Sequence, residues 1–363
     1  MACRLRQYAN AAVAGAGIAV STTTVAVLEG PRRGPEATVI VPGSRPPLDH
    51  EDMIVRDRPN AWVLFFTLRG SILPRIVWPL VACTGLAVVV TLAHGVLFHW
   101  KITLTPVPFT LIGLALSIFL GFRNGAAYER FWEARKLWGD VIHGSRTYAR
   151  QVTAYVGSTS SMAARQDEDQ KIAIHRVVAF AHALRCHLRG LPSDGEAGRW
   201  LLPEEASAFK SSRERCGFLL RRGAEDLGRW NRNLGVQAPL IAEMDQSLAR
   251  LSAAQAGCER IASTPIPFAY TLLLHRTAYL YCFLLPFGLV DLAGAMTPAV
   301  VAIVAYTFFG LDALGDEIER PFGTRPHHLP LDALCRTIEI SLLETNGESE
   351  LPAAMEPVDG VLR

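Results

Sequence analysis

Four long apolar segments constrain this chain more than any other feature of its sequence. They cover residues 76–98, 102–122, 268–290 and 292–311. Each is close to the length of about 20 mostly apolar residues with which a helix crosses a bilayer. Most charged residues lie outside these segments, although 50% of the 363 residues are hydrophobic. This segregation predicts an all-α integral membrane protein with four transmembrane helices in two hairpins.

The rest of the chain is organised around these two hairpins. Residues 1–52 begin with two arginines and continue as an Ala-, Gly- and Pro-rich stretch, which we interpret as disordered or as a leader that is not native; a signal peptide is the alternative. Between the hairpins, apolar residues recur at helical spacing over residues 141–156, 170–189, 204–234 and 238–261. The expected parts are an N-terminal extension at 1–52, a first hairpin at 53–135, a helical cytosolic domain at 136–263, a second hairpin at 264–323, and a C-terminal segment and tail at 324–363.

Basic residues flank the first hairpin on both sides. Cytoplasmic loops of membrane proteins carry an excess of Lys and Arg, so both flanks and both chain ends are expected in the cytoplasm, with the protein in the inner (plasma) membrane. The basic residues before and after this hairpin are Arg56, Arg58, Arg69, Arg75, Arg123, Arg130, Arg135 and Lys136.

A row of bulky apolar residues, Leu114, Ile118 and Phe122, recurs every four positions in the second segment. Residues at this spacing share one helix face. Small residues (Gly113, Ala115, Ser117 and Gly121) lie beside and between them, as is common where membrane helices pack closely. From the residues alone, the row can face lipid, a packed bundle or a pore.

Ionisable residues cluster at both ends of the second hairpin. His275 and Arg276 lie near its beginning, where they either bear on permeation or pair with acidic neighbours. An acidic cluster lies at the other end of the hairpin and consists of Asp312, Asp316, Glu317 and Glu319. We interpret these carboxylates as ion-pair partners of arginines such as Arg123 and Arg130. A negative vestibule that attracts cations is the alternative.

Signatures of catalysis and of cofactor binding are missing from the sequence. It has no HExxH motif, phosphate-binding glycine loop or nucleophile elbow, and its seven cysteines form no CxxC pair. His175 and His182 have no evident carboxylate partner, and we interpret them as core or solvated residues rather than metal ligands. We therefore expect no enzyme, no cofactor, no metal and no nucleic-acid partner. A metabolite-binding receptor or enzyme in the membrane and a secondary transporter remain alternatives.

Three blocks of sequence resemble the bestrophins, particularly their bacterial branch. The first is FLGFRN at 119–124, followed by YERFWEAR at 128–135. The second is PIPFAY at 265–270 with His275 and Arg276. The third runs from Gly310 to Glu319 and continues as PFG at 321–323. The resemblance covers about residues 53–344.

The resemblance implies a homopentamer in the lipid bilayer, whose second helices line a central pore for small monovalent ions. It places the hydrophobic neck of the pore at Leu114, Ile118 and Phe122, and a second, cytosolic constriction at Ile266. A ring of apolar side chains can block conduction by dewetting and pass ions when it widens.

Two positions depart from the pattern of the animal bestrophins. Their necks are richer in Phe, whose positive ring edge can face an anion. Ile118 offers no such edge, so chloride or another anion is expected from the family and a cation from this residue. Where animal members hold calcium with aspartates, this chain has Arg325 and His328, and we expect no calcium clasp.

Overall fold

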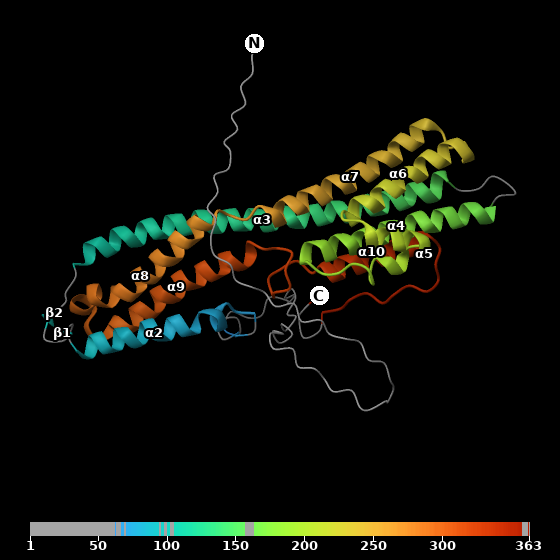
Figure 1. Ribbon diagram of the computed structural model, residues 1–363. Coiled ribbons are helices and arrows are strands. Elements are labelled where there is room, and N and C mark those ends of the chain that lie inside the picture. The colour runs from blue at the N-terminus through green and yellow to red at the C-terminus, as the bar shows by residue number, and fades with distance from the viewer. Residues whose placement is uncertain are drawn as a thin grey trace, which may run out of the picture. The chain divides into compact units, whose positions relative to one another are not determined.

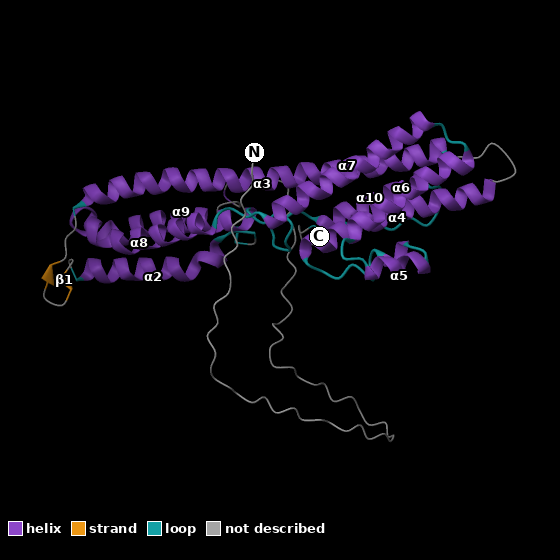
Figure 2. Cartoon of the chain, turned by 45° about the horizontal axis from the view of Figure 1, so that its top comes forward, coloured by secondary structure: helices purple, strands orange, loops and turns teal. Residues whose placement is uncertain are grey.

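The computed structural model describes residues 62, 67–68, 70–93, 96–97, 100–101, 105–156, 163–357 and 362. The expected N-terminal extension lies outside these residues, as do Arg56, Arg58 and Arg69 of the expected basic flank. The described part is almost entirely helical, as predicted (Figure 1; Figure 2). Its α-helices are α2 (Leu73–Leu92), α3 (Pro106–Tyr155), α4 (Ala163–Arg189), α5 (Pro203–Ser211), α6 (Arg215–Leu234), α7 (Ala238–Ser263), α8 (Phe268–Ala293), α9 (Thr297–Ile318) and α10 (Leu331–Thr345).

A short antiparallel ribbon connects α2 to α3. Strand β1 (Val96–Leu97) pairs with β2 (Trp100–Lys101), and Val96 lies opposite Lys101. Because the apolar residues at the end of the first predicted segment form β1, α2 ends at Leu92 rather than at residue 98.

Helix α3 is uninterrupted over 50 residues. It begins at Pro106, where proline is favourable because its missing N–H has no partner in the first turn. The expected domain boundary at residue 135 and the separate helix expected at 141–156 both fall inside it. The charged segment 123–140 is rich in Arg, Glu and Ala, which favour helix, and it contains no proline that would end the helix.

The helix predicted over residues 204–234 is two helices instead. α5 ends at Ser211, and α6 begins at Arg215. Between them the backbone of Ser212 is extended, with ψ at 135°. Paired serines compete for backbone hydrogen bonds in non-helical conformations, which is a physical reason for the break.

Helix α3 takes part in two hydrophobic cores. Its first half packs against α8 and α9, which in turn pack against α2, and these four helices form the apolar bundle (Figure 1). Its second half packs against α4, α7 and α10, and α6 packs on α4 and α7 to complete the second bundle. Cys83 and Cys282, both inside predicted apolar segments, are buried together in the apolar bundle, where Cys83 Sγ donates to the Cys282 carbonyl oxygen at 3.1 Å.

Three helical stretches among the described residues are long and apolar enough to cross a membrane: Leu73–Leu92, Pro106–Tyr155 and Phe268–Ile318. The third contains α8 and α9, which are joined by a 3-10 turn, η2 (Gly294–Met296), and pack against each other. α9 does not end before Asp312, as the fourth predicted segment did, but continues to Ile318. The acidic cluster therefore begins on a helix rather than on a loop. A second 3-10 turn, η1 (Gly198–Trp200), lies between α4 and α5.

Candidate functional site: an exposed apolar row and a buried charge network on α3

The predicted row lies on an exposed face of α3. Within a single chain, Leu114, Ile118 and Phe122 are 61%, 48% and 67% exposed. Leu116 and Leu120 are buried in the apolar bundle. Two residues along an α-helix correspond to a rotation of about 200°, so the exposed row and the buried pair lie on nearly opposite faces. The row is therefore not part of the core of its own chain.

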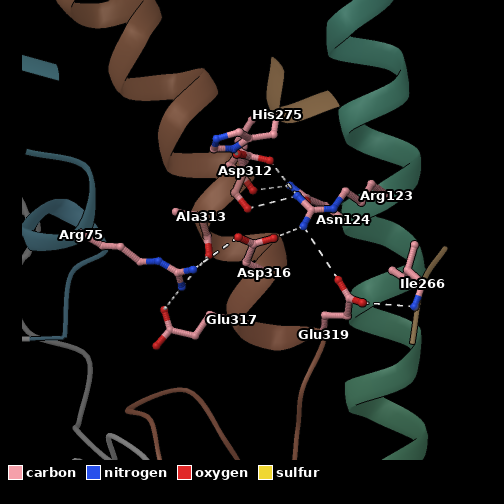
Figure 3. A network of polar contacts seen from close by, with 11 residues as sticks. Arg75, Arg123, Asn124, Ile266, His275, Asp312, Ala313, Asp316, Glu317 and Glu319 are labelled. Atoms are coloured by element: carbon pink, nitrogen blue, oxygen red, sulfur yellow. Dashed lines mark hydrogen bonds and ion pairs between the residues drawn. The ribbon is translucent and has the colours of Figure 1, made fainter. Parts of the chain in front are cut away.

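Arg123, the residue after Phe122, turns into the bundle and is only 1% exposed. Its Nη1 donates to the Asp312 carboxylate at 2.8 Å and to the Asp312 carbonyl oxygen at 3.2 Å. Its Nη2 pairs with Asp316 and lies 3.8 Å from Glu319 Oε2 (Figure 3). A buried guanidinium is unfavourable unless carboxylates compensate its charge, and these three residues of α9 and its C-terminal end do so.

Two further residues contact the same acidic cluster. Arg75 of α2 lies 3.3 Å from Asp316 Oδ2 and 3.9 Å from Glu317 Oε2. His275 of α8 has its Nδ1 2.7 Å from Asp312 Oδ2 (Figure 3). The acidic end of α9 thus joins α2, α3 and α8. The ion pairs with Arg123 and Arg75 confirm the favoured interpretation of the cluster as a partner of arginines.

Arg130 binds backbone carbonyls, so its expected pairing with the carboxylates is wrong. Its Nη1 donates to the Thr264 carbonyl at 2.6 Å, its Nη2 to the Ile261 carbonyl at 2.6 Å, and its Nε to the Glu319 carbonyl at 3.3 Å. The carbonyls at the end of a helix have no partner within the helix, and a cation there is favourable. Arg130 therefore fixes the end of α7 against α3, directly before the segment that contains Ile266.

Ile266, the expected second constriction, lies half-buried just before α8. Its backbone N–H donates to Glu319 Oε1 at 3.1 Å (Figure 3). The other carboxylate oxygen of Glu319 faces Arg123. A chain of direct contacts thus connects the residue after Phe122 to the backbone of Ile266, a connection that sequence spacing could not reveal because the three residues are far apart in the chain.

The segment after α9 closes around His328. Its Nδ1 accepts a hydrogen bond from the Arg325 N–H, and its Nε2–H donates to the Glu317 carbonyl, both at 3.1 Å. Burial lowers the pKa of His328 to about 4, so the ring is neutral at pH 7. Within the described residues, no three His, Cys, Asp or Glu side chains form a group suited to a metal ion. The expected lack of a calcium clasp stays a prediction.

The two histidines of α4 have carboxylate partners that local spacing could not reveal. His175 Nε2 lies 2.7 Å from Glu348 Oε1, and His182 Nε2 lies 2.8 Å from Glu339 Oε1. Burial lowers the pKa of His182. Both carboxylates come from α10 or the residues after it, so the beginning of the expected tail is attached to α4 by Glu348.

Comparison with known proteins agrees with the resemblance in the sequence. The bacterial/fungal bestrophin family model matches residues 53–344. A voltage-dependent anion channel-forming protein of Mesorhizobium japonicum is 42% identical over 315 residues, which cover 86% of this chain and 98% of that protein. A protein of the same description from Escherichia coli is 40% identical over 305 residues, covering 84% and 98%. The crystal structure of a bacterial bestrophin homologue from Klebsiella pneumoniae matches with a TM-score of 0.71 and 36% identity, covering 76% of this chain and 100% of that chain.

Proposed function

Because the chain belongs to the bacterial and fungal bestrophin family, we propose that it is an ion channel of five copies whose α3 helices line a central pore. Each copy crosses the membrane four times, through α2, the first half of α3, α8 and α9. Small monovalent ions pass through this pore, and no catalytic group or cofactor takes part.

The observation that carries the proposal is the exposed row Leu114, Ile118 and Phe122. Its face of α3 is turned away from α8 and α9, and the three side chains of the row stay largely exposed in one chain. Five copies related by a rotation axis place five such rows around one axis, where they form the hydrophobic neck. A narrow ring of this kind excludes water and ions until it widens. Ile266 forms the second constriction.

The orientation follows from the charges. Arg75 precedes the apolar part of α2 and Arg123 follows the row on α3, and both meet at the acidic end of α9. This charged layer is the cytoplasmic end of the apolar bundle by the positive-inside rule. Both ends of the chain then lie in the cytoplasm, and the second bundle extends from the inner membrane into it.

The related proteins of M. japonicum and E. coli are described as anion channel-forming, which favours an anion as the permeant ion. One observation on this chain favours a cation instead: the middle of the row is Ile118, an aliphatic side chain without the positive edge of an aromatic ring. The sign of the permeant ion is therefore the first property to measure.

The test is reconstitution of the purified full chain in planar bilayers. We expect a homopentamer by native mass spectrometry and a steady conductance that grows with protein added. Reversal potentials in asymmetric KCl and then NaCl give the sign of the permeant ion. A monomer, or a pentamer without conductance, contradicts the proposal. Current that disappears on calcium chelation contradicts the expected lack of a calcium clasp.

A further inference from the structure

Two neighbouring cavities lie where the start of α2 meets the end of α9. The first has a volume of about 400 Å³ and is lined mainly by apolar groups of both helices. The second, of about 500 Å³ (the charged cavity), contains Arg75, Glu317 and Arg325 among apolar residues such as Pro74 and Pro326. Gly70, Ser71, Ile72 and His327 line both cavities, so the two are continuous along the start of α2.

The apolar cavity follows one face of α9. Thr307, Gly310 and Leu314 recur at intervals of three and four residues and therefore line a single groove. Gly310 lines the groove beside Ile72 and contributes no side chain that would fill it. The groove is open to the outside of the bundle, and an extended hydrocarbon chain is the kind of group that its lining accepts.

Two arginines, Arg75 and Arg325, line the charged cavity, and they differ in their partners among the described residues. Arg75 is engaged by Asp316 and Glu317, so it offers little to a ligand. The exposed guanidinium of Arg325 has neither an ion pair nor a hydrogen bond within the part of the chain that the structure describes. His327, half-buried, stands between this arginine and the apolar groove.

We propose that these two cavities bind one anionic phospholipid of the cytoplasmic leaflet, with an acyl chain in the groove on α9 and the phosphate at Arg325. The guanidinium matches a phosphate in charge and in hydrogen-bond geometry. A free anion would use only the charged cavity. A zwitterionic lipid such as phosphatidylcholine carries the same phosphate, but its own quaternary ammonium offsets that charge, so it gains less from Arg325 than an anionic lipid does. The site lies where the apolar part of α9 gives way to its acidic end, which is the level of the headgroups in the proposed orientation.

Native mass spectrometry of the detergent-solubilised full chain tests this proposal, with phosphatidylglycerol and phosphatidylcholine added in equal amounts. The wild type is expected to retain phosphatidylglycerol preferentially. Arg325→Gln should lower the ratio of bound phosphatidylglycerol to phosphatidylcholine about fivefold, the effect of about 1 kcal/mol for one basic residue at an anionic membrane surface. Thr307→Phe should fill the groove and reduce retention of both lipids.

Arg320→Gln is the matched control, because Arg320 is an exposed arginine close in sequence that lines neither cavity. It should behave as the wild type. Equal lipid ratios in Arg325→Gln and wild type, or no lipid retained by the wild type because a second copy covers the groove, would overturn the proposal. So would displacement of the lipid by millimolar inorganic phosphate, which would indicate a free-anion site. None of these measurements depends on conduction, so the proposal of a lipid site and the proposal of a channel can be contradicted independently of each other.

Discussion

Arg123 is the residue on which the geometry of the site depends most. Its side chain is fully buried, and its partners Asp312 and Asp316 belong to a different helix. Removing one member of a buried ion pair leaves an uncompensated charge, which typically costs about 3–5 kcal/mol. The adjacent position in the chain is Phe122, so a displaced Arg123 also displaces the end of the row.

We therefore expect Arg123→Gln to lower the stability of the solubilised protein by about 3–5 kcal/mol, seen as a lower melting midpoint. Glu319→Gln is the comparison, because its amide oxygen can still accept the hydrogen bond from the Ile266 N–H. The Glu319→Gln variant should lose only about 1 kcal/mol of stability. Similar losses in the two variants would contradict the central place of Arg123.

His328 predicts a pH dependence of stability. The ring is buried and neutral, and its pKa is lowered from 6.5 to about 4. Between these two values the unfolded chain binds a proton that the folded chain does not, so stability is complete above pH 6.5 and falls as the pH falls toward 4. Across this pH range the titration of His328 changes the free energy of unfolding by about 3 kcal/mol.

The melting midpoint measured from pH 7.5 to 4.5 checks this prediction. His328→Gln, which cannot titrate, should be less stable at pH 7.5 but should lose less of its remaining stability on acidification. A variant with the same pH profile as the wild type would show that other groups, such as the buried His182, determine the profile.

At the scale of the helices, α3 and α7 approach closely at positions without side chains. A Cβ atom at Gly144 would lie 2.9 Å from Cδ2 of Leu251, which is fully buried. At Gly139, five residues earlier on the same helix, a Cβ atom would meet nothing within 4 Å. The same substitution should therefore have opposite effects at the two positions.

Gly144→Ala is expected to destabilise the protein by about 1–3 kcal/mol through overpacking. Gly139→Ala is expected to stabilise it by about 0.5–1 kcal/mol, because alanine has the higher helix propensity. The melting midpoints of the two variants, compared with that of the wild type, test both expectations. Stabilisation by both would mean that α7 can move away from α3 at little cost.

The helices could be predicted from the sequence more reliably than their limits. Apolar spacing indicated α2, α4, α7, α8 and α9, because each buries one face against neighbours. It could not show that α3 continues through the charged segment, since a change in composition resembles a domain boundary although the backbone remains helical. It also missed the break at Ser212, where a local competition for hydrogen bonds outweighs a continuing apolar pattern.

The charge network was predictable only in part. The excess of carboxylates after the fourth apolar segment indicated ion pairs with Arg123, and these are present. That Arg130 binds carbonyls, and that Glu319 accepts from the Ile266 N–H, depends on how α3, α7 and α9 pack. Such contacts join residues more than 50 positions apart, and no periodicity in the sequence encodes them.

At the scale of the whole molecule, the proposed channel makes the neck the main barrier to ions. Changing Leu114, Ile118 and Phe122 together to Ala should widen the ring, admit water and give a pore that conducts continuously in planar bilayers. Ile303→Ala, an exposed apolar position on α9 in the same bundle, should leave the current unchanged. Unchanged current in the triple variant would remove these residues from the neck.

The single variant Ile118→Phe tests whether the middle residue of the row determines the sign of the permeant ion, apart from its role in blocking ions. If the aliphatic ring at this level favours cations, wild-type reversal potentials should be cation-selective, and those of the variant should shift toward anions, because the new aromatic edges carry positive potential. Anion selectivity of the wild type that is unaffected by this substitution would show that Ile118 does not determine the sign of the permeant ion.

The uninterrupted length of α3 has a mechanical consequence. A helix of 50 residues is about 75 Å long, more than twice the hydrocarbon thickness of a bilayer of about 30 Å. It contains no proline after Pro108 that would kink it, and in the proposed channel its far half lies outside the bilayer. A torque applied by α7 or α10 to that half turns Leu114, Ile118 and Phe122 about the same axis. In the proposed channel, the width of the neck would then be set by leverage from the solvent side, without a relay of rearranged side chains between the two ends of the helix.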